Sequence, residues 1–278
     1  QNFGDLIQIS GLSHGTDVWN GNAQDLIKNK TCTISQVIGT RDSIMTELIH
    51  KGVDPKLAFD VMELTRKGKV AKLGFPPGVE DTLRTNGVED WYLDSCRKIK
   101  YMFPKAHAVA YLISAIRLMW FKIYQPLAFY STYFTVRGED IDYEAAVGGK
   151  AVAKRHLARA TDLAKAEKTA KNEDTVTSLQ LVYEYLCRGF EFLPIELGRS
   201  RAKEYVLEEG KIRLPFLAIK GVGETAAASL EEATIDGQQY LSMEELQSVT
   251  GVSGTVMETL GGMGALGSMP KSNQTSLF

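Results

Sequence analysis

The stretch Lys98-Ile-Lys-Tyr-Met-Phe-Pro-Lys-Ala-His-Ala-Val-Ala-Tyr111 places a cation, an imidazole and an aromatic ring at the predicted start of a long helix. Pro104 fits the first helical position, because its fixed φ suits a helix and its missing N–H is not needed there. Lys105 and His107 then fall in the first turn, where unpaired backbone N–H groups and the helix dipole favour an anion. Tyr111 follows His107 by about one helical turn and shares its face. The pattern fits a nucleoside triphosphate site, and it equally fits a basic helix start whose aromatic packs in the core.

Positive charge in this sequence is local rather than global. The net charge is −2, so no overall field draws the chain to nucleic acid. One cluster comprises Lys98, Lys100 and Lys105, and another comprises Arg66-Lys-Gly-Lys69 with Lys72. Charged clusters are usually solvated surface, so each indicates binding only in combination with a motif.

The chain reads as helical up to Arg188 and changes character after it. Asp54 and Pro55 are a typical N-cap and first helical residue. The run Lys150–Lys171 is rich in Ala and Lys and predicts an exposed helix or linker. Later segments are short and apolar, with a glycine-containing turn, which is typical of strands. The expected strands are Phe190–Leu197, Glu204–Leu207 and Lys211–Leu214.

Composition favours a cytoplasmic protein. The run Ala106–Ile123 is apolar enough to raise the question of a membrane span, but His107 and Arg117 within it favour a buried helix. The chain opens at Gln1 without a Met or a secretory signal, which suggests a piece of a longer protein. Three widely spaced cysteines fit buried thiols in a reducing compartment better than disulfides or a zinc site; they are Cys32, Cys96 and Cys187.

The segment Phe216–Leu230 matches a helix-hairpin-helix, a motif that binds DNA through its backbone. Gly221 and Gly223 allow a tight turn whose N–H groups hold a phosphate without reading sequence. We expect Lys220 and Thr225 to flank this phosphate site. The residues expected to pack the two helices together are Phe216, Ile219, Val222, Ala227 and Leu230.

A second, weaker copy of this motif covers Leu246–Leu260. Ser253 stands where the second glycine of the loop is expected, so this copy fits a packing partner better than a phosphate site. DNA glycosylases also carry such hairpins, and they need a catalytic Asp in a Gly/Pro-rich context. Asp236 lies in a turn-like segment instead, so we discount a glycosylase.

Few residues suggest catalysis. Asp140 and Asp142 have the spacing of a two-metal carboxylate pair, but they directly precede a predicted helix, where acidic side chains act as caps. His14 and Asp17 lie in a turn with no nucleophile beside them, so we expect a structural role. We therefore expect neither catalytic nor metal-ligating residues in this sequence.

Taken together, these motifs resemble the C-family of bacterial replicative DNA polymerases, most closely those of the PolC type. The similarity extends over nearly the whole chain. The sequence departs from the family in the loop Val70–Pro77 and at Thr275, where the tail motif usually has Leu. The matching segments are Phe3–Ile7, Ile9–Trp19, Cys32–Ser35, Val37–Gly39, Arg41–Asp42, Phe103–Tyr111, Phe134–Arg137, Ile219–Gly223 and Gln274–Phe278.

The resemblance implies a mainly α fold with four parts. These are a helical fingers domain at residues 1–189, a small β-hairpin connector at 190–215, a tandem helix-hairpin-helix domain at 216–267 and a tail at 268–278. The implied activity is DNA-directed DNA polymerisation, a nucleotidyl transfer in chromosome replication. The catalytic aspartates and their Mg²⁺ ions would lie in the palm of the parent enzyme, upstream of this sequence.

The same resemblance implies the binding residues and partners. The partners would be primer–template DNA, the incoming dNTP, the sliding clamp and the remainder of the polymerase chain, with no membrane. The clamp would bind the tail through Gln274, Leu277 and Phe278. The duplex would contact Lys220, Gly221, Val222, Gly223 and Thr225. The triphosphate would be bound by Arg41, Arg66, Lys69, Lys105, His107 and Tyr111.

The alternative is a non-enzymatic DNA-binding module or a repair protein built on helix-hairpin-helix units. This alternative accounts for Ile219–Leu230 but gives no role to Phe103–Tyr111 or to Arg66–Lys69. An Asp-x-Asp strand upstream of Gln1 would distinguish a polymerase from it.

Overall fold

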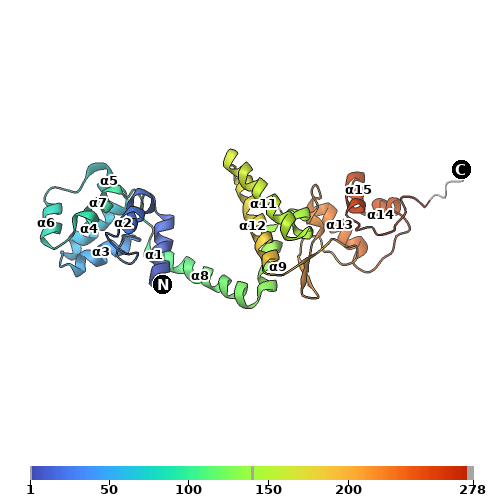
Figure 1. Ribbon diagram of the computed structural model, residues 1–278, viewed down its shortest axis with the longest axis horizontal. Coiled ribbons are helices and arrows are strands. Elements are labelled where there is room, and N and C mark those ends of the chain that lie inside the picture. Colours follow the sequence, from blue (N-terminus) through green and yellow to red (C-terminus); the bar gives the residue numbers. More distant parts are fainter. Residues whose placement is uncertain (1, 139–140, 274–278) are drawn as a thin grey trace. The chain divides into compact units, whose positions relative to one another are not determined.

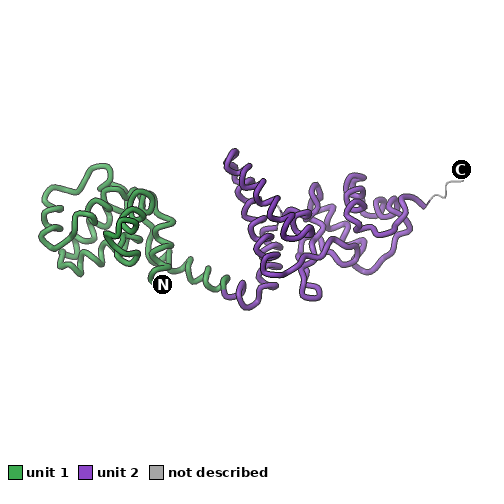
Figure 2. Tube along the Cα trace, viewed as in Figure 1, with its two compact units in different colours: residues 1–119 green, residues 120–278 purple. Residues whose placement is uncertain are grey.

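Helices make up most of the chain in the computed structural model, which describes residues 2–138 and 141–273 (Figure 1). The chain divides into two compact units, residues 1–119 and residues 120–278 (Figure 2). The predicted fold class, mainly α with a few short strands late in the chain, is confirmed.

The helices of the first unit begin at residues with clear local signals. The Asp54 carboxylate accepts a hydrogen bond from the backbone N–H of Leu57, and Pro55 opens the helix, as predicted. The elements of this unit are α1 (Phe3–His14), η1 (Trp19–Ala23), α2 (Gln24–Lys28), α3 (Arg41–His50), α4 (Pro55–Arg66), α5 (Lys69–Leu73), α6 (Val79–Thr85), α7 (Asp90–Lys98) and the start of α8 (Lys105–Tyr124).

The core of the first unit extends into the non-helical segment between α7 and α8. Leu48 of α3 and Leu93 of α7 are fully buried in it, and so is Ile99, directly after α7. Met102 is 1% exposed. Lys100 and Tyr101 between them are exposed, so this segment lies at the surface and is anchored to the core by Ile99 and Met102.

The second unit begins with helices and ends with a small sheet and further helices. Its elements are α9 (Pro126–Arg137), α10 (Tyr143–Val147), α11 (Gly149–Ala166), α12 (Ala170–Cys187), β1 (Phe192–Leu193), β2 (Val206–Glu208), β3 (Lys211–Arg213), η3 (Phe216–Ala218), α13 (Glu224–Thr234), α14 (Met243–Thr250) and α15 (Gly254–Gly262).

The predicted β-hairpin is confirmed and is part of a three-stranded sheet. Strands β2 and β3 pair antiparallel, with Glu208 opposite Lys211. Glu209 and Gly210 between them have φ angles of 50° and 79°, as a two-residue hairpin turn of the right twist requires. Strand β1 pairs parallel with β3, which gives the order β1-β3-β2.

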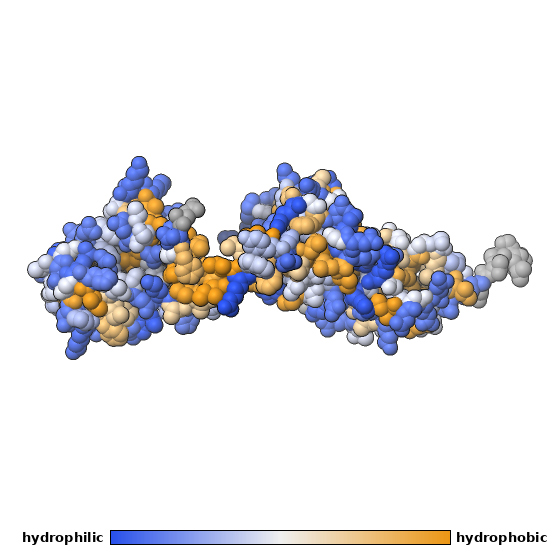
Figure 3. All heavy atoms as spheres, turned by 90° about the horizontal axis from the view of Figure 1, so that it is seen from below, coloured by the Kyte–Doolittle hydropathy of each residue, from blue (hydrophilic) through white to orange (hydrophobic). Residues whose placement is uncertain are grey.

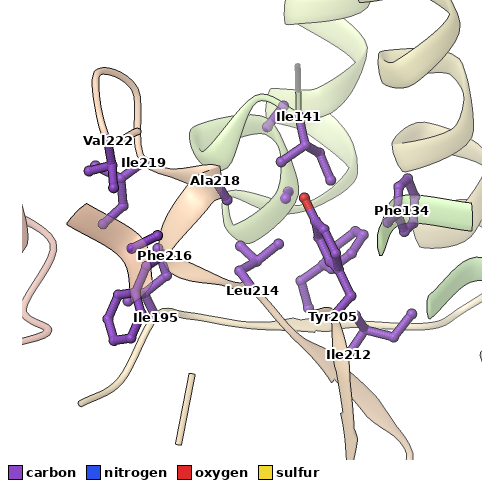
Figure 4. Packing of buried hydrophobic residues seen from close by; sticks show 14 of the residues in the cluster. Phe134, Ile141, Ile195, Tyr205, Ile212, Leu214, Phe216, Ala218, Ile219 and Val222 are labelled. Atoms are coloured by element: carbon purple, nitrogen blue, oxygen red, sulfur yellow. The ribbon is translucent and has the colours of Figure 1, made fainter. Parts of the chain in front are cut away.

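One hydrophobic core joins the helices, the sheet and the loop before α13 in the second unit. Figure 4 shows Phe134 of α9, Ile212 of β3 and Phe216 of η3 among its members, and each is at most 1% exposed. Because α9 to α12 share this core, they belong structurally with the later part of the chain. The structural boundary at 119/120 therefore precedes the boundary after residue 189 that we predicted for the fingers.

Helix α8 is exposed, so the expectation of a buried helix at Ala106–Ile123 is wrong. Among the described residues it is the one helix long and apolar enough to span a membrane by length and composition, with a mean hydropathy of 1.3. Only 6% of the apolar stretch of this helix is buried, and Figure 3 shows apolar surface along the helix. Exposed apolar side chains occupy every position from Leu118 to Phe121. Because consecutive residues point in different directions around a helix, packing against one face of α8 could not bury them all.

A buried arginine stabilises the sheet and gives a pH-dependent prediction. Arg213 is 3% exposed and donates hydrogen bonds to both carboxylate oxygens of Glu208 and to the carbonyl of Pro194. Its guanidinium lowers the pKa of Glu208. Replacing Glu208 by Gln should therefore destabilise the sheet by about 1.5–3 kcal/mol at neutral pH, the contribution of hydrogen bonds to a charged group.

Hydrogen exchange of peptides covering 206–213 measures this loss. Because the pKa of Glu208 is lowered in the folded state, its contribution is present above the ordinary Glu pKa of about 4.3 and is lost as the pH falls below it. The difference between wild type and Glu208→Gln should therefore shrink in acid. The control is Glu209→Gln at the exposed turn. Equal destabilisation by both variants would contradict the assignment.

Candidate functional site

The segment Lys100–Phe103 connects three parts of the first unit through its backbone. The carbonyl of Tyr101 accepts a hydrogen bond from the N–H of Thr16 at 2.9 Å. The N–H of Met102 donates to the carbonyl of Arg66 at 3.3 Å, and the carbonyl of Phe103 accepts from the N–H of Arg41 at 3.2 Å. The start of α3 and the end of α4 are thereby fixed beside the start of α8.

Gly68 allows the chain before α5 to lie against this segment. It is buried and has a φ of +67°, and a Cβ there would lie 2.6 Å from the carbonyl oxygen of Lys100. Only glycine satisfies both the left-handed conformation and the close approach. The Gly in Arg66-Lys-Gly-Lys69 therefore has a packing role.

The start of α8 carries a carboxylate cap as well as cations. The backbone N–H of Lys105 donates to Oδ2 of Asp42 at 2.7 Å, and Nε of Arg41 lies 3.9 Å from the same oxygen. The N–H groups of Ala106 and His107 precede the first bond of the helix, from Ala108 to Pro104. They have no hydrogen-bond partner within 2–138 and 141–273, so two donors remain for an anion.

An aromatic cluster surrounds Phe103 at the start of α8. Its ring centroid lies 4.9 Å from that of His14, 6.0 Å from that of His107 and 6.0 Å from that of Tyr111. The Tyr111 ring is nearly parallel to that of His14, at 8°, and the residue is 61% exposed. The predicted shared face of His107 and Tyr111 is consistent with these contacts. Sequence reasoning assigned His14 only to a turn and missed its place in this cluster.

Lys105 and Lys69 line different hollows. Lys105 lines one of about 290 Å³ together with Gln8, Thr40 and Ser43. Lys69 lines another, of about 390 Å³, that includes Glu63 and Lys67. The six residues predicted to bind a triphosphate are therefore not all gathered at one place in this structure.

Several cations near the site already have partners. The Arg66 guanidinium donates to Glu63 at 2.8 Å, and with Lys67 it lowers the pKa of Glu63 to about 2. Lys100 pairs with Asp17 at 2.8 Å. Lys98, which we expected to add to the positive charge, donates to the carbonyl of Gly21. Arg66 would have to leave Glu63 to bind a triphosphate.

The loop before α13 is a tight turn that presents Lys220 to solvent. The N–H of Val222 donates to the carbonyl of Ile219 at 3.1 Å, and Gly221 between them has a φ of +88°. Figure 4 shows Ile219 and Val222 together at the base of this loop, and both are buried. The predicted turn is thus present, and its left-handed position is Gly221.

The first helix of the motif is shorter than predicted. Only the 3₁₀ turn η3 (Phe216–Ala218) precedes the loop, so a full helix at this position was a wrong expectation. Strand β3 ends at Arg213 and Pro215 follows, which leaves room for a single turn before Ile219. The packing residues Phe216, Ile219 and Val222 are nevertheless buried as predicted.

Gly223 and the first turn of α13 form an open group of donors. The first bond into the helix runs from the N–H of Ala227 to the carbonyl of Gly223. The N–H groups of Gly223, Glu224 and Thr225 lack partners in the described part of the chain. Gly223 has an ordinary φ of −90°, and a Cβ there would meet nothing within 4 Å. We predicted that both glycines permit the turn. Only Gly221 has the left-handed conformation that the turn requires, whereas Gly223 leaves open space beside the start of α13.

The second copy of the motif repeats the left-handed glycine but has a side-chain cap at its second helix. Gly251 ends α14 with a φ of +66°, and Val252 is buried. Ser253 caps α15, and its hydroxyl accepts from the N–H of Val256 at 3.4 Å. The second copy thus carries a capping side chain at the position that is Gly223 in the first copy.

The remaining sequence candidates have structural roles or lie outside the described residues. Oδ1 of Asp142 accepts from the N–H of Ala145, and its Oδ2 lies 2.5 Å from Nδ1 of His156. No group of three or more His, Cys, Asp or Glu that could hold a metal occurs in residues 2–138 and 141–273. The predictions that fall outside these ranges concern Asp140 and the tail residues Gln274, Leu277 and Phe278.

Comparisons with known proteins agree with this architecture. Residues 1–74 match the family described as the bacterial DNA polymerase III alpha subunit finger domain, and residues 189–276 match the helix-hairpin-helix motif. The chain is 47% identical over 278 residues to the DNA polymerase III PolC-type of Bacillus cereus, and 45% identical over 276 residues to that of Bacillus subtilis. It is 44% identical over 279 aligned residues to that of Streptococcus mutans.

A finger domain followed by helix-hairpin-helix units defines a piece of a bacterial replicative DNA polymerase. The chain belongs to the PolC-type DNA polymerase III family, since the similarity covers 99% of it. It spans 19% of the length of these relatives.

Proposed function

We propose that this chain is the C-terminal part of a DNA-directed DNA polymerase and that it binds the incoming dNTP and duplex DNA. The observation that carries the proposal is the aromatic cluster at the start of α8, next to open backbone donors and Lys105. The complete enzyme transfers a nucleotidyl group from a dNTP to a primer end in the bacterial cytoplasm. The rest of the polymerase chain would cover the exposed apolar side chains of α8.

The first unit would bind the nucleotide electrostatically and by stacking. The N–H groups of Ala106 and His107, with the side chains of Lys105 and Arg41, would hold phosphate oxygens. The exposed ring of Tyr111 offers a stacking surface for the base or a cover for the sugar. Arg66 and Lys69 would join this site only after rearrangement, because Arg66 now pairs with Glu63 and Lys69 lines a separate hollow.

The residues that the structure describes do not fit a resident magnesium site. Mg²⁺ needs several oxygen ligands, and the Asp142 carboxylate already caps α10 and contacts His156. We place the Mg²⁺ ions of the reaction in the palm of the longer enzyme. The role of this chain is positioning and electrostatic stabilisation.

The second unit would bind the duplex without reading its sequence. Lys220 at the turn and the N–H groups from Gly223 to Thr225 would hold a phosphate as a backbone nest does. A non-enzymatic DNA-binding module would also account for this loop. The finger-domain match over residues 1–74 supports the polymerase instead.

Replacing Lys105 by Ala in a complete polymerase should weaken the use of dNTP by roughly ten- to hundredfold. This is the loss of one charge-assisted contact of about 1.5–3 kcal/mol. Steady-state kinetics with varied dNTP measures it, and binding of primer–template should change little. The control is Lys28→Ala, an exposed lysine at the end of α2. An unchanged dependence on dNTP in the Lys105 variant would contradict the site.

Replacing Gly223 by Val should weaken binding of duplex DNA while leaving the fold intact. A Cβ at this position meets no protein atom within 4 Å, and the added side chain would occupy the space through which a phosphate would approach. Wild-type binding should be independent of sequence and fall steeply with salt. Fluorescence anisotropy with labelled duplexes measures both properties.

The contrast with Gly221 provides the control for the Gly223 variant. Gly221→Ala should lower stability by about 1–2 kcal/mol, because alanine is strained at a positive φ. Gly223→Val should leave thermal unfolding unchanged. Sequence-selective, salt-insensitive binding, or full affinity in Gly223→Val, would refute the phosphate site.

We further propose that the tail docks on the sliding clamp, as the resemblance implies for Gln274, Leu277 and Phe278. Two apolar residues at the end of a polar segment suit an apolar pocket on a partner. Their burial, at about 1.5–3 kcal/mol each, allows a modest affinity. Simultaneous binding of DNA would raise the effective concentration of the tail.

Deleting Leu277 and Phe278 from a complete polymerase should abolish synthesis that depends on the clamp and spare distributive synthesis on short templates. Primer extension with and without the clamp measures the two activities. Equal loss of both would mean that the tail serves the polymerase itself rather than the clamp.

A further inference from the structure

The exposed face of α11 in the second unit is unusually basic. The helix buries Ala153 and partly buries Val152, His156, Leu157 and Ala160. At 100° per residue, the opposite face carries exposed cations separated by exposed alanines. These residues are Lys150, Ala151, Lys154, Arg155, Ala158, Arg159, Asp162 and Lys165.

Four of these cations have no partner. Lys165 pairs with Asp162 at 3.3 Å, which uses the one carboxylate on this face. The side chains of Lys150, Lys154, Arg155 and Arg159 make no hydrogen bond or ion pair with any residue that the structure describes. Other arginines of the same unit do make such pairs: Arg199 with Glu208, Arg201 with Glu231 and Arg213 with Glu208.

The spacing of these cations opposes helix stability. Lys150 and Lys154 are four residues apart, as are Arg155 and Arg159, so each pair places like charges one turn apart. Such a pair destabilises a helix slightly, whereas a Glu–Lys pair would stabilise it. A face that served only solubility would gain from carboxylates at these positions. Alanines between the cations instead leave room for a long anion to approach the helix.

The arm that α11 forms with α12 also adjoins the loop of the first helix-hairpin-helix. Figure 1 shows α11 and α12 side by side. A hollow of about 740 Å³ is lined by Lys171 and Thr175 of α12 and by Lys220 and Gly221 of the loop. Asp142 and Glu144 line it too, and their charge would repel phosphates from its interior. Phosphate contacts would therefore fall on the loop and on the exposed arm that flank the hollow.

We propose that Lys150, Lys154, Arg155 and Arg159 of α11 bind the phosphate backbone of the duplex DNA that the Ile219–Gly223 loop binds. The inference rests on the proposed DNA binding of that loop. From Lys150 to Arg159 the helix rises about 14 Å, at 1.5 Å per residue. This equals the axial length of about four base pairs. At 100° per residue the four side chains spread over half the circumference of the helix, so they suit phosphates spaced around it rather than in one straight line. The contact adds affinity and salt dependence without sequence preference.

The test compares Arg155→Ala/Arg159→Ala with wild type in anisotropy titrations of the chain with a labelled duplex, from about 50 to 200 mM salt. Alanine is the best helix former, so the fold should persist. We expect the salt slope to fall by about two, one for each lost phosphate contact. Affinity should fall on the order of ten- to hundredfold at about 0.1 M salt. Arg155→Lys/Arg159→Lys keeps both charges and should retain the slope.

A charge-matched control separates this contact from net charge. Arg199→Gln/Lys211→Gln removes two cations that already pair with Glu208 and Glu191, and it should leave the slope unchanged. If Gly223→Val weakens binding but the α11 variant binds like wild type, the inference is overturned while the loop stands. An equal effect of the control and the α11 variant also overturns it. If wild type shows no salt-dependent binding, the inference and the proposed DNA binding both fail.

Discussion

The organisation of the first unit depends on hydrogen bonds made by the backbone of Lys100–Phe103. This segment contributes donors and acceptors to the turn at Thr16, to the end of α4 at Arg66 and to the start of α3 at Arg41. Buried Ile99 and Met102 anchor it to the core, and pairing its backbone groups avoids the cost of leaving them unsatisfied there. The start of α8 therefore has a fixed position relative to the cap residue Asp42 and to the aromatic ring of His14.

Both candidate binding sites rely on backbone donors at helix starts, with few side-chain charges. At α8 the carboxylate of Asp42 takes one donor, and those of Ala106 and His107 remain. At α13 the space beside Gly223 keeps the donors accessible. The second hairpin has Ser253 at the matching position, and its hydroxyl caps the N–H of Val256. A side chain beside the helix start, rather than the left-handed glycine of the turn, distinguishes the two hairpins.

The sequence predicted those features that depend on neighbouring residues. The Asp54–Pro55 helix start, the β2–β3 hairpin and the turn at Gly221 each follow from local backbone preferences. The contact of Arg66 with Glu63 follows from the same local rules, since residues three apart on a helix are neighbours. This contact means that one cation of the Arg66–Lys69 cluster is already paired.

Features that depend on distant contacts could not be predicted. The stacking of His14 on Phe103 joins α1 to the start of α8, and no local pattern encodes it. The apolar character of α8 suggested burial, yet most of its large apolar side chains after Tyr111 are exposed in the described part of the chain. The shared core of α9 to α12 with the sheet placed the boundary between the compact units earlier than the motifs indicated.

The most direct test is a structure of a complete polymerase that contains this chain, bound to primer–template DNA and the incoming dNTP. The account predicts that the triphosphate lies at the start of α8, within hydrogen-bond distance of Lys105 and the His107 backbone, with Tyr111 against the base or sugar. A triphosphate bound away from the start of α8, with the Phe103 cluster packed against protein alone, would contradict it.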